Sequence, residues 1–328
     1  IIGTGMSLAH SFYRVLWRQS WLRPRLRKSV YKKLCARGDQ LDFPFSKDFY
    51  GLRFEGNLNN SIEFSIYYYD AFEKPLLYFL GDTLHNINSS QPDSDRLTCF
   101  CDVGANIGQH SLFMSRLADQ VHAFEPFAEV SNRLRRHIKL NQLENVELHR
   151  IGLSDATEKL TFYAPTGRNQ GIGSFDASTT GKGNQAAGEL TLARGDEYFE
   201  EFPIGRVDLM KIDVEGFESK VLAGLEQTLQ QYRPIIVCEV SYSGEMSFDS
   251  VESLLQSLPA DYALFTFNTR KTDGSKARRR GARARKTGGY ELIPCTDWRE
   301  SGQDDIIACP TEKKSILPMQ GTGRIPVP

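Results

Sequence analysis

The chain has 328 residues, of which 40% are apolar and 25% are charged, and these proportions exclude a disordered or fibrous protein. No run reaches the ~18–20 consecutive apolar residues of a membrane-spanning helix, and the first residues show no secretory signal, so the sequence predicts a cytoplasmic protein. The six cysteines form no CxxC pair, and most fall in apolar, strand-like runs, which indicates buried free thiols.

The net charge of −1 conceals two basic segments. Residues 1–38 and 270–286 each carry nine Lys or Arg residues. Together the two segments contain one Asp and no Glu. Outside these segments 22 basic residues stand against 40 acidic ones, so the rest of the chain is strongly acidic. Such segments are typical of a solvated arm and a mobile loop. They also suit contact with an anionic lipid surface or an acidic polymer.

The N-terminal basic segment has the pattern of a partly amphipathic helix over residues 8–37, interrupted by Pro24. Such a helix could lie on a membrane surface, with Trp17, Trp21 and Leu22 turned toward the lipid and arginines near the phosphates. The alternatives are packing onto the acidic body of the protein and contact with a second copy in a homo-oligomer.

Aromatic and β-branched residues alternate from Phe43 to about Leu84, which predicts a short β-hairpin followed by a short helix. The polar stretch 85–95 has the composition of a linker. We therefore expect three regions. They are an N-terminal helical and β-hairpin extension (1–95), a main domain (96–312) and a C-terminal tail (313–328).

Strands alternate with helices throughout the main domain. The expected strands are 97–103, 120–124, 146–151, 207–212, 235–240, 263–267 and 305–308, and the expected helices are 109–118, 128–140, 218–229 and 248–258. A hairpin at 159–165, a Gly-rich loop over 167–188 and a short strand at 190–192 interrupt the pattern. This alternation predicts an α/β fold with a doubly wound, mostly parallel, seven-stranded sheet, whose ligands bind at the carboxyl ends of the strands.

The first of these strands runs into a Gly-rich loop, CDVGANIGQHS, from Cys101 to Ser111. Gly104 and Gly108 let the backbone approach a ligand closely, and the following helix begins with free N–H groups. The loop lacks the GxGxxG spacing that receives a dinucleotide pyrophosphate. It better suits a ligand without phosphates, such as the amino-acid end of S-adenosylmethionine. A tight strand-to-helix turn without a ligand is the alternative.

Acidic residues follow the next two strands. Glu125 could accept hydrogen bonds from both hydroxyls of an adenosine ribose, or it could cap the following helix. Asp155, in the sequence GLSD, could meet an adenine amino group or belong to an ordinary turn. The segment DLMKIDVEGFE places Asp213 and Glu215 at the end of a further strand, where they suit a general base or metal ligands, or cap the following helix with Glu218.

Together these motifs resemble the FkbM family of methyltransferases. The resemblance rests on DVGANIGQHS, AFEP, the LSD turn, DLMKIDVEGFE and RPIIVCEV, with a closing strand at DDIIACP. It implies a class I methyltransferase (Rossmann-like) fold and S-adenosylmethionine as the methyl donor. It also implies O-methylation of a hydroxyl on a sugar, a glycan or another natural product.

The resemblance also assigns roles by position. From the methionine end of the cofactor to its adenine end, the implied contacts are Asp102, Gly104, Asn106, Gly108, Glu125, Ser154 and Asp155. Asp213 and Glu215 are implied to face the methyl-transfer centre.

A hydroxyl acceptor has a high pKa, so a base must take its proton as the new bond forms. Family members often carry a His two residues after Glu239, where this chain has Ser241. Asp213 is the first candidate for the base, and Glu215 and Glu239 are in reserve. His110 in the Gly-rich loop is a further candidate. Alternatively, Asp213 and a second carboxylate could bind Mg²⁺, which would lower the acceptor pKa directly.

Other function classes fit parts of the pattern. An NAD(P)-dependent oxidoreductase shares the strand, loop and distal acid but not GxGxxG. A nucleic-acid methyltransferase would explain the basic segments, but the acidic DVEG segment would repel phosphates, so no nucleic-acid partner is expected. A non-catalytic module would bind the cofactor without turnover. In the favoured interpretation, residues 270–286 help to cover the acceptor site and suit an acidic acceptor.

Overall fold

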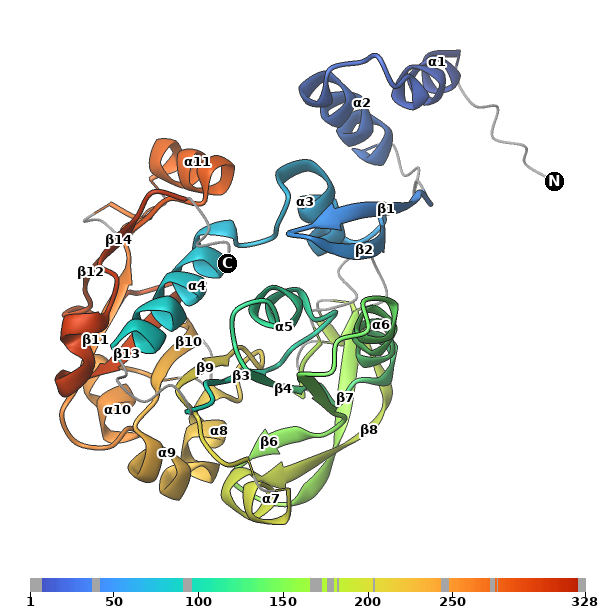
Figure 1. Cartoon of the computed structure of the whole chain (residues 1–328). Coiled ribbons are helices and arrows are strands. Elements are labelled where there is room, and N and C mark those ends of the chain that lie inside the picture. The colour runs from blue at the N-terminus through green and yellow to red at the C-terminus, as the bar shows by residue number, and fades with distance from the viewer. Residues whose placement is uncertain are drawn as a thin grey trace. The chain divides into compact units, whose positions relative to one another are not determined.

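The computed structural model of the chain describes these ranges: residues 8–36, 42–90, 96–165, 173–175, 180–181, 183–202, 204–242, 248–271, 275 and 277–323. The chain divides into two units, one formed by residues 1–49 and 53–72 and the other by residues 50–52 and 73–328 (Figure 1). The helix α4 (Lys74–Ser89), which the sequence-based division assigns to the N-terminal extension, belongs to the second, larger unit.

The N-terminal unit is built from helices and a β-hairpin, as the sequence predicts. Its elements are α1 (Leu8–Arg18), α2 (Pro24–Ala36), β1 (Pro44–Phe49), β2 (Leu52–Asn57) and α3 (Ser61–Tyr69), and β1 pairs with β2. Pro24 is the first residue of α2, where its missing N–H leaves no helical hydrogen bond unmade. The proline therefore starts a second helix rather than kinking one long helix.

Trp17 lies in the hydrophobic core of this unit. Its ring centroid is 5.2 Å from that of Tyr31 and 6.1 Å from that of Tyr68, and its side chain is buried together with Leu22. The prediction that Trp17 and Leu22 face a membrane is therefore wrong, because both side chains fill the space between the helices and the hairpin. Trp21, in contrast, is 72% exposed.

A nine-stranded sheet forms the centre of the larger unit. Its order is β14-β12-β11-β13-β10-β9-β3-β4-β5. The parallel strands are β3 (Cys99–Val103), β4 (Gln120–Phe124), β5 (Val146–His149), β9 (Leu209–Ile212) and β10 (Ile235–Ser241). The antiparallel strands are β11 (Tyr262–Phe267), β12 (Tyr290–Pro294), β13 (Gln303–Pro310) and β14 (Gln320–Gly321).

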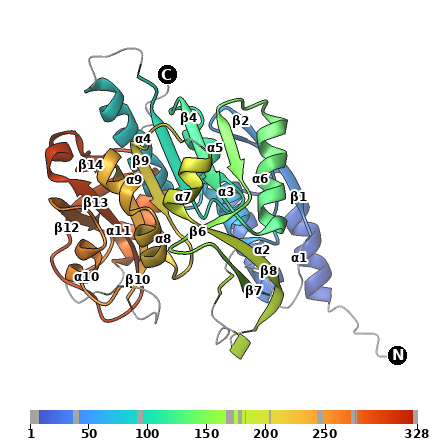
Figure 2. The same ribbon diagram turned by 90° about the horizontal axis from the view of Figure 1, so that it is seen from below.

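Helices cover both faces of this sheet (Figures 1 and 2). On one face lie α4, α5 (Gln109–Met114) and α6 (Ala128–Leu140), and on the other lie α7 (Gly195–Glu201), α8 (Glu218–Gly224), α9 (Glu226–Tyr232) and α10 (Val251–Gln256). The direction in which the chain adds strands to the sheet reverses between β3 and β9. From β3 the chain adds β4 and β5 on one side, and it then adds β9 and β10 on the other side of β3. In doubly wound folds such a switch point opens the ligand-binding crevice.

The predicted α/β class and doubly wound sheet are confirmed. The sheet is mixed rather than mostly parallel, because four of the eight pairings between its described strands are parallel and four are antiparallel. The sheet has two more strands than expected, β12 and β14, both short and both at the antiparallel edge. A smaller sheet, in the order β6-β8-β7, joins β6 (Gly152–Ser154), β7 (Glu158–Pro165) and β8 (Asn184–Arg194). Much of the predicted loop 167–188 lies outside the described residues. Each helix described is too short or too polar to span a lipid bilayer.

Two segments expected to be irregular are partly helical. The predicted linker 85–95 is helical up to Ser89, and residues 91–95 lie outside the described part. In the basic segment, Arg278–Thr287 form an exposed helix, α11, instead of a mobile loop. Ala, Arg and Lys are strong helix formers, and Gly288, with φ of +78°, ends the helix in the left-handed conformation.

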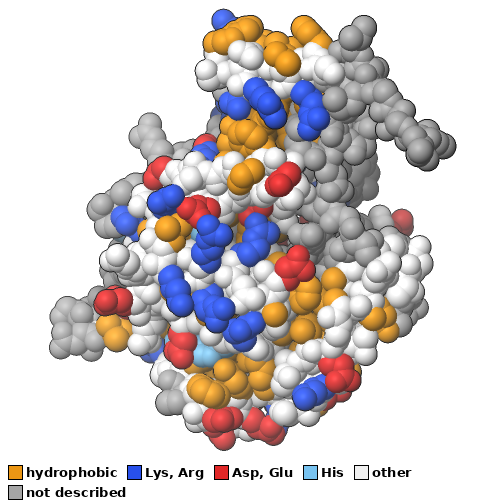
Figure 3. Space-filling view, turned by 90° about the vertical axis from the view of Figure 1, so that its right-hand side faces the viewer, with side chains coloured by type: hydrophobic (Ala, Val, Ile, Leu, Met, Phe, Trp, Pro, Cys, Tyr) orange, Lys and Arg blue, Asp and Glu red, His pale blue; other side chains and the backbone are white. Residues whose placement is uncertain are grey.

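The larger unit also has a basic surface that the charge count along the chain does not reveal. Lys and Arg side chains gather on the face that carries α6 (Figure 3). The basic residues of this helix are Arg133, Arg135, Arg136 and Lys139. They recur at helical spacing within a segment of mixed composition, so they gather in space without forming a run in the sequence.

Candidate active site

The Gly-rich loop links β3 to α5 at the switch point. Gly104 has φ of +83°, and a Cβ atom added to it would come within 1.8 Å of the carbonyl oxygen of Asp213. Gly108 has φ of +85°, and a Cβ atom added to it would come within 2.1 Å of the side chain of Leu134 in α6. Side chains at these two positions would collide with their neighbours, so glycine is required there. The loop is thereby held against the end of β9.

Asp102, the fourth residue of β3, is completely buried. Its Oδ2 accepts a hydrogen bond of 2.6 Å from the Ser111 hydroxyl, whereas its Oδ1 has no hydrogen-bond partner among the described residues. Burial raises the pKa of this carboxyl, and the nearby Lys211 opposes the increase. A buried acceptor with one oxygen still to be satisfied is a feature of a ligand site.

Glu125 follows β4 and is held by the backbone. Its Oε2 accepts the Asn106 N–H at 2.9 Å, and its Oε1 accepts the Phe127 N–H at 2.9 Å. Burial raises the pKa of Glu125 to about 7, although both N–H groups act against the increase. Each carboxylate oxygen can accept a second hydrogen bond. The cap-like contact with Phe127, at the start of α6, and a contact with a ligand are therefore compatible.

Ser154 and Asp155 lie at the end of β6. The Ser154 hydroxyl is 3.1 Å from Asp155 Oδ1, and Lys220 Nζ of α8 is 3.8 Å from the same oxygen. A side chain at Gly224 would collide with the Ser154 carbonyl, so α8 packs closely on this turn. The contacts of Asp155 join it to α8 rather than to the Gly-rich loop.

Three acidic side chains come together near the carboxyl ends of β9 and β10. They belong to Asp213, Glu215 and Glu239, and we call them the carboxylate cluster. One oxygen from each lies within 4.8 Å of the others. Asp213 follows β9, Glu215 occupies the next turn with φ of +53°, and Glu239 belongs to β10. Glu218 fixes that turn, because its Oε1 accepts the N–H groups of Val214 and Gly216. The structure thus brings together the three residues that the sequence proposes as catalytic.

The members of the carboxylate cluster differ in protonation. Burial raises the pKa of Asp213, but the ammonium of Lys211, 2.8 Å from its Oδ2, outweighs this effect and holds the pKa below its ordinary value. Burial and the charge of Asp213 raise the pKa of Glu239 to about 11 and that of Glu215 to about 8. At neutral pH, Asp213 is ionised and Glu239 is a protonated acid hydrogen-bonded to it.

Lys211 is a central residue that the sequence reasoning missed. Its side chain is 3% exposed and lies on β9, in the otherwise apolar run LMKI. Burial lowers its pKa, but Asp213, Asp102 and Glu73 raise it further, so the amine stays charged. A lysine within an apolar strand is rare unless it is paired, and this irregularity was the available signal.

Glu73 and Asp305 also belong to this environment. Asp305, on β13, stands opposite Glu239 in the strand register, and burial followed by the charge of Asp213 raises its pKa to about 7. Glu73 precedes α4 with φ of +47°, and burial, Asp305 and Asp213 raise its pKa. His110 Nε2 is 3.9 Å from Glu73 Oε2, and burial keeps the pKa of this imidazole well below its ordinary value. His110 is therefore a neutral ring at the same site.

Comparison with known proteins agrees with this geometry. Residues 102–262 match the family model of the methyltransferase FkbM domain. Methyltransferase 1 of Beauveria bassiana is 31% identical over 173 residues, which are 48% of this chain and 69% of that protein. The chain belongs to the FkbM methyltransferase family. The matched region contains the Gly-rich loop, Glu125, Asp155 and the carboxylate cluster.

Two further relatives of this FkbM methyltransferase carry more specific names. The hexuronic acid methyltransferase AglP of Haloferax volcanii is 33% identical over 137 residues, which are 42% of this chain. The match spans about half of AglP, 53% of its length. The 2-O-methyltransferase NoeI of Sinorhizobium fredii is 26% identical over 176 residues, 48% of this chain and 70% of that protein.

Proposed function

We propose that this FkbM-family chain transfers a methyl group from S-adenosylmethionine to a hydroxyl of a sugar, a glycan or another small acceptor. One observation carries the proposal. Gly104 of the Gly-rich loop packs against the backbone of Asp213, a member of the carboxylate cluster, at the switch point of the sheet. A donor bound by the loop would have its methyl group close to ionisable oxygens. The family membership and the names of AglP and NoeI support the same reaction.

The cofactor fits the Gly-rich side of the site. Asp102, whose Oδ1 is buried without a partner among the described residues, is suited to the polar amino-acid end, together with Gly104, Asn106 and Gly108. Glu125 is suited to the ribose hydroxyls because both of its oxygens keep an acceptor position. Ser154 and Asp155 are proposed to lie beside the adenine. When bound, the sulfonium supplies an activated methyl group.

In the reaction the acceptor oxygen forms a bond to the methyl carbon while the carbon–sulfur bond breaks, and the acceptor proton passes to a base. Asp213 is our first candidate because it is ionised at neutral pH. Glu215 and Glu239 remain in reserve, and each must lose its own proton before it can act. Lys211 acts through Asp213, because it holds that carboxylate in place at 2.8 Å.

A divalent cation is the alternative to a base. The carboxylate cluster offers three oxygens within 4.8 Å of one another, the donor type that Mg²⁺ prefers. A bound Mg²⁺ would lower the pKa of the acceptor hydroxyl. Loss of activity in EDTA, restored by Mg²⁺, would favour the cation, whereas full activity in EDTA would favour the base.

The acceptor is proposed to be acidic. The basic helix α11 packs on α4, and a side chain at Gly288 would collide with Tyr78 of α4. Glu73, beside the carboxylate cluster, directly precedes α4, so α11 lies along the helix that starts at the site. Arginines there suit a carboxylate-bearing sugar, in agreement with the name of AglP.

The test is a methyl-transfer assay with labelled S-adenosylmethionine, a hexuronic acid and the matching neutral hexose. Asp213→Asn should lower kcat by about 100-fold or more while S-adenosylhomocysteine still binds. Replacing Arg278, Arg279 and Arg280 with Ala should raise KM for the uronic acid only, with Arg135→Ala on α6 as the control. Activity of Asp213→Asn within a few-fold of wild type would overturn its catalytic role, and an unchanged KM would overturn that of α11.

The N-terminal helices suit a second, separate role in binding an anionic membrane surface. Phe12, Val15, Trp21 and Leu26 are each more than half exposed, and the described segment 8–36 contains no acidic residue. Apolar side chains among arginines are typical of interfacial helices. Trp21→Ser should reduce co-sedimentation with phosphatidylserine vesicles. Unchanged binding to lipid, or a dimer that hides Trp21, would contradict this role.

A further inference from the structure

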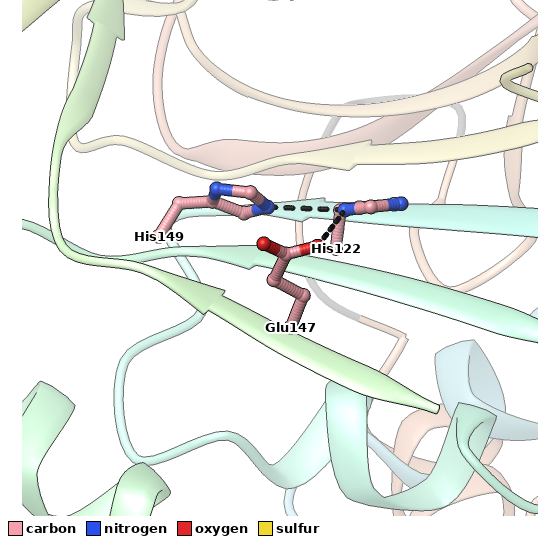
Figure 4. Close-up of side chains that lie close together, drawn as sticks. All are labelled: His122, Glu147 and His149. Carbon is pink, nitrogen blue, oxygen red and sulfur yellow. Dashed lines mark hydrogen bonds and ion pairs between the residues drawn. The ribbon is translucent and has the colours of Figure 1, made fainter. Parts of the chain in front are cut away.

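A second group of side chains able to bind a metal lies on the edge strand β5 and its neighbour β4, apart from the carboxylate cluster. His122 on β4 and Glu147 on β5 are direct partners in the strand register, and His149 is two residues further along β5 (Figure 4). Alternate residues of a strand project to the same face, so all three side chains share one side of the sheet. Tyr198 of α7 covers His149 on that side.

The three donor atoms are close together. His122 Nδ1 is 3.0 Å from His149 Nε2 and 3.6 Å from Glu147 Oε2 (Figure 4). All three donor atoms lie within 4.8 Å of one another. For bonds of about 2.05 Å, these two separations correspond to angles at a shared metal ion of about 94° and 123°, on either side of the tetrahedral value. The two separations from His122 Nδ1 are therefore compatible with a roughly tetrahedral ion.

Neighbouring side chains complete the arrangement that metal-binding histidines require. A histidine that binds metal through Nε2 keeps its proton on Nδ1 and donates it to an acceptor. The Nδ1 atom of His149 is 3.0 Å from the hydroxyl oxygen of Tyr198, which can be that acceptor. The ring of His149 is also fixed by stacking on Phe124, with 4.5 Å between centroids. On the other side, the thiol of Cys99 interacts with the His122 ring.

One of the three side chains is open to solvent, so an ion could reach the site from the surface. The two histidines are buried, whereas the side chain of Glu147 is 62% exposed. The carboxylate can thus meet an ion at the surface, and water can supply a fourth ligand. The alternative is a hydrogen bond between the two rings, with Glu147 beside His122 as its partner in the strand register.

We propose that His122, Glu147 and His149 form a binding site for a zinc-class divalent transition metal. Two imidazoles and one carboxylate are a known ligand set for zinc. The ion would fasten the edge strand β5 to β4 and, through Tyr198, to α7. The site is separate from the proposed methyl transfer, so either proposal can fail without the other.

The test is titration of the metal-free protein with Zn²⁺, followed by calorimetry and thermal unfolding. Wild type should bind an ion at His122, Glu147 and His149 with micromolar or tighter affinity and show a higher Tm. Glu147→Gln should weaken the affinity about tenfold or more. Glu144→Gln, which changes an exposed acid just before β5, is the matched control and should bind like wild type. Because Glu147 is exposed, its variant should fold normally.

Cobalt provides a second measurement that identifies the ligands. Co²⁺ at this site should give visible bands of a tetrahedral nitrogen and oxygen set, without the near-ultraviolet thiolate band that cysteine ligands produce. His149→Gln should abolish these bands. No binding by wild type, equal binding by Glu147→Gln, or a strong thiolate band would each overturn the proposal. The first result would leave the two histidines as a hydrogen-bonded pair.

Discussion

The ends of β4 and β9 each carry a carboxylate, buried at Glu125 and partly buried at Asp213, and the two groups behave in opposite ways. Burial raises the pKa of Glu125 to about 7, and two backbone N–H donors oppose this shift. At Asp213 burial acts in the same direction, but Lys211 reverses the result. Neutral dipoles thus moderate the effect of burial, whereas a full counter-charge at 2.8 Å overcomes it.

The largest expected effect comes from removing that counter-charge. Lys211→Met would leave the carboxylates of Asp213, Asp102 and Glu73 close together without a cation, and it should destabilise the protein by about 3–5 kcal/mol. Urea denaturation followed by circular dichroism measures the loss. Lys220→Met, at a partly exposed lysine of α8, is the control and should change stability by less than about 1 kcal/mol. Equal stability of the two variants would mean that Lys211 is not the organising charge.

A second variant tests the close contact between the Gly-rich loop after β3 and the end of β9. Gly104→Ala places a methyl group against the Asp213 carbonyl in a left-handed backbone, so it should lower stability by about 2–4 kcal/mol and weaken cofactor binding. Gly216→Ala also has a positive φ, but nothing lies within 4 Å of its added methyl group. It should therefore lose only about 1 kcal/mol. If both variants lost the same amount, conformational strain alone would explain Gly104.

A smaller effect should appear in the pH dependence of cofactor binding. Glu125 is ionised above its pKa of about 7 and protonated below it, and only the ionised form can accept from both ribose hydroxyls while keeping its two N–H bonds. Affinity for S-adenosylhomocysteine should therefore be about tenfold weaker at pH 6 than at pH 8. Glu125→Gln should bind weakly and without this pH dependence. A wild-type affinity that is constant from pH 6 to 8 would contradict the role of Glu125.

The sequence was sufficient to predict the elements that position the site. Strands buried on both faces read as apolar runs, so the polar residue that ends each run, such as Glu125 or Asp213, marks the carboxyl end of a strand. Gly104 and Gly108 marked the loop for a similar reason, because no other residue type tolerates that conformation with such close neighbours. Family resemblance added the roles of these residues, which composition alone could not assign.

The remaining features depend on contacts between distant parts of the chain. Glu73 and Asp305 are 232 positions apart, and only the folded arrangement places both in the environment of Asp213. Trp17 and Leu22 fitted an amphipathic pattern, but the pattern could not tell whether their apolar face meets lipid or the protein's own core. The two-residue strand β14 carries too few residues to show any period.

The most direct test of the proposed cofactor site is calorimetric titration with S-adenosylhomocysteine. Wild type should bind with micromolar affinity, and the double variant Asp102→Ala, Glu125→Ala should lose this binding. A double variant of exposed acids, Glu129→Ala, Glu144→Ala, is the matched control and should bind like wild type. Circular dichroism must show that all three proteins are folded. Absence of binding by folded wild type, or unchanged binding by the Asp102→Ala, Glu125→Ala variant, would contradict a cofactor site at the ends of β3 and β4.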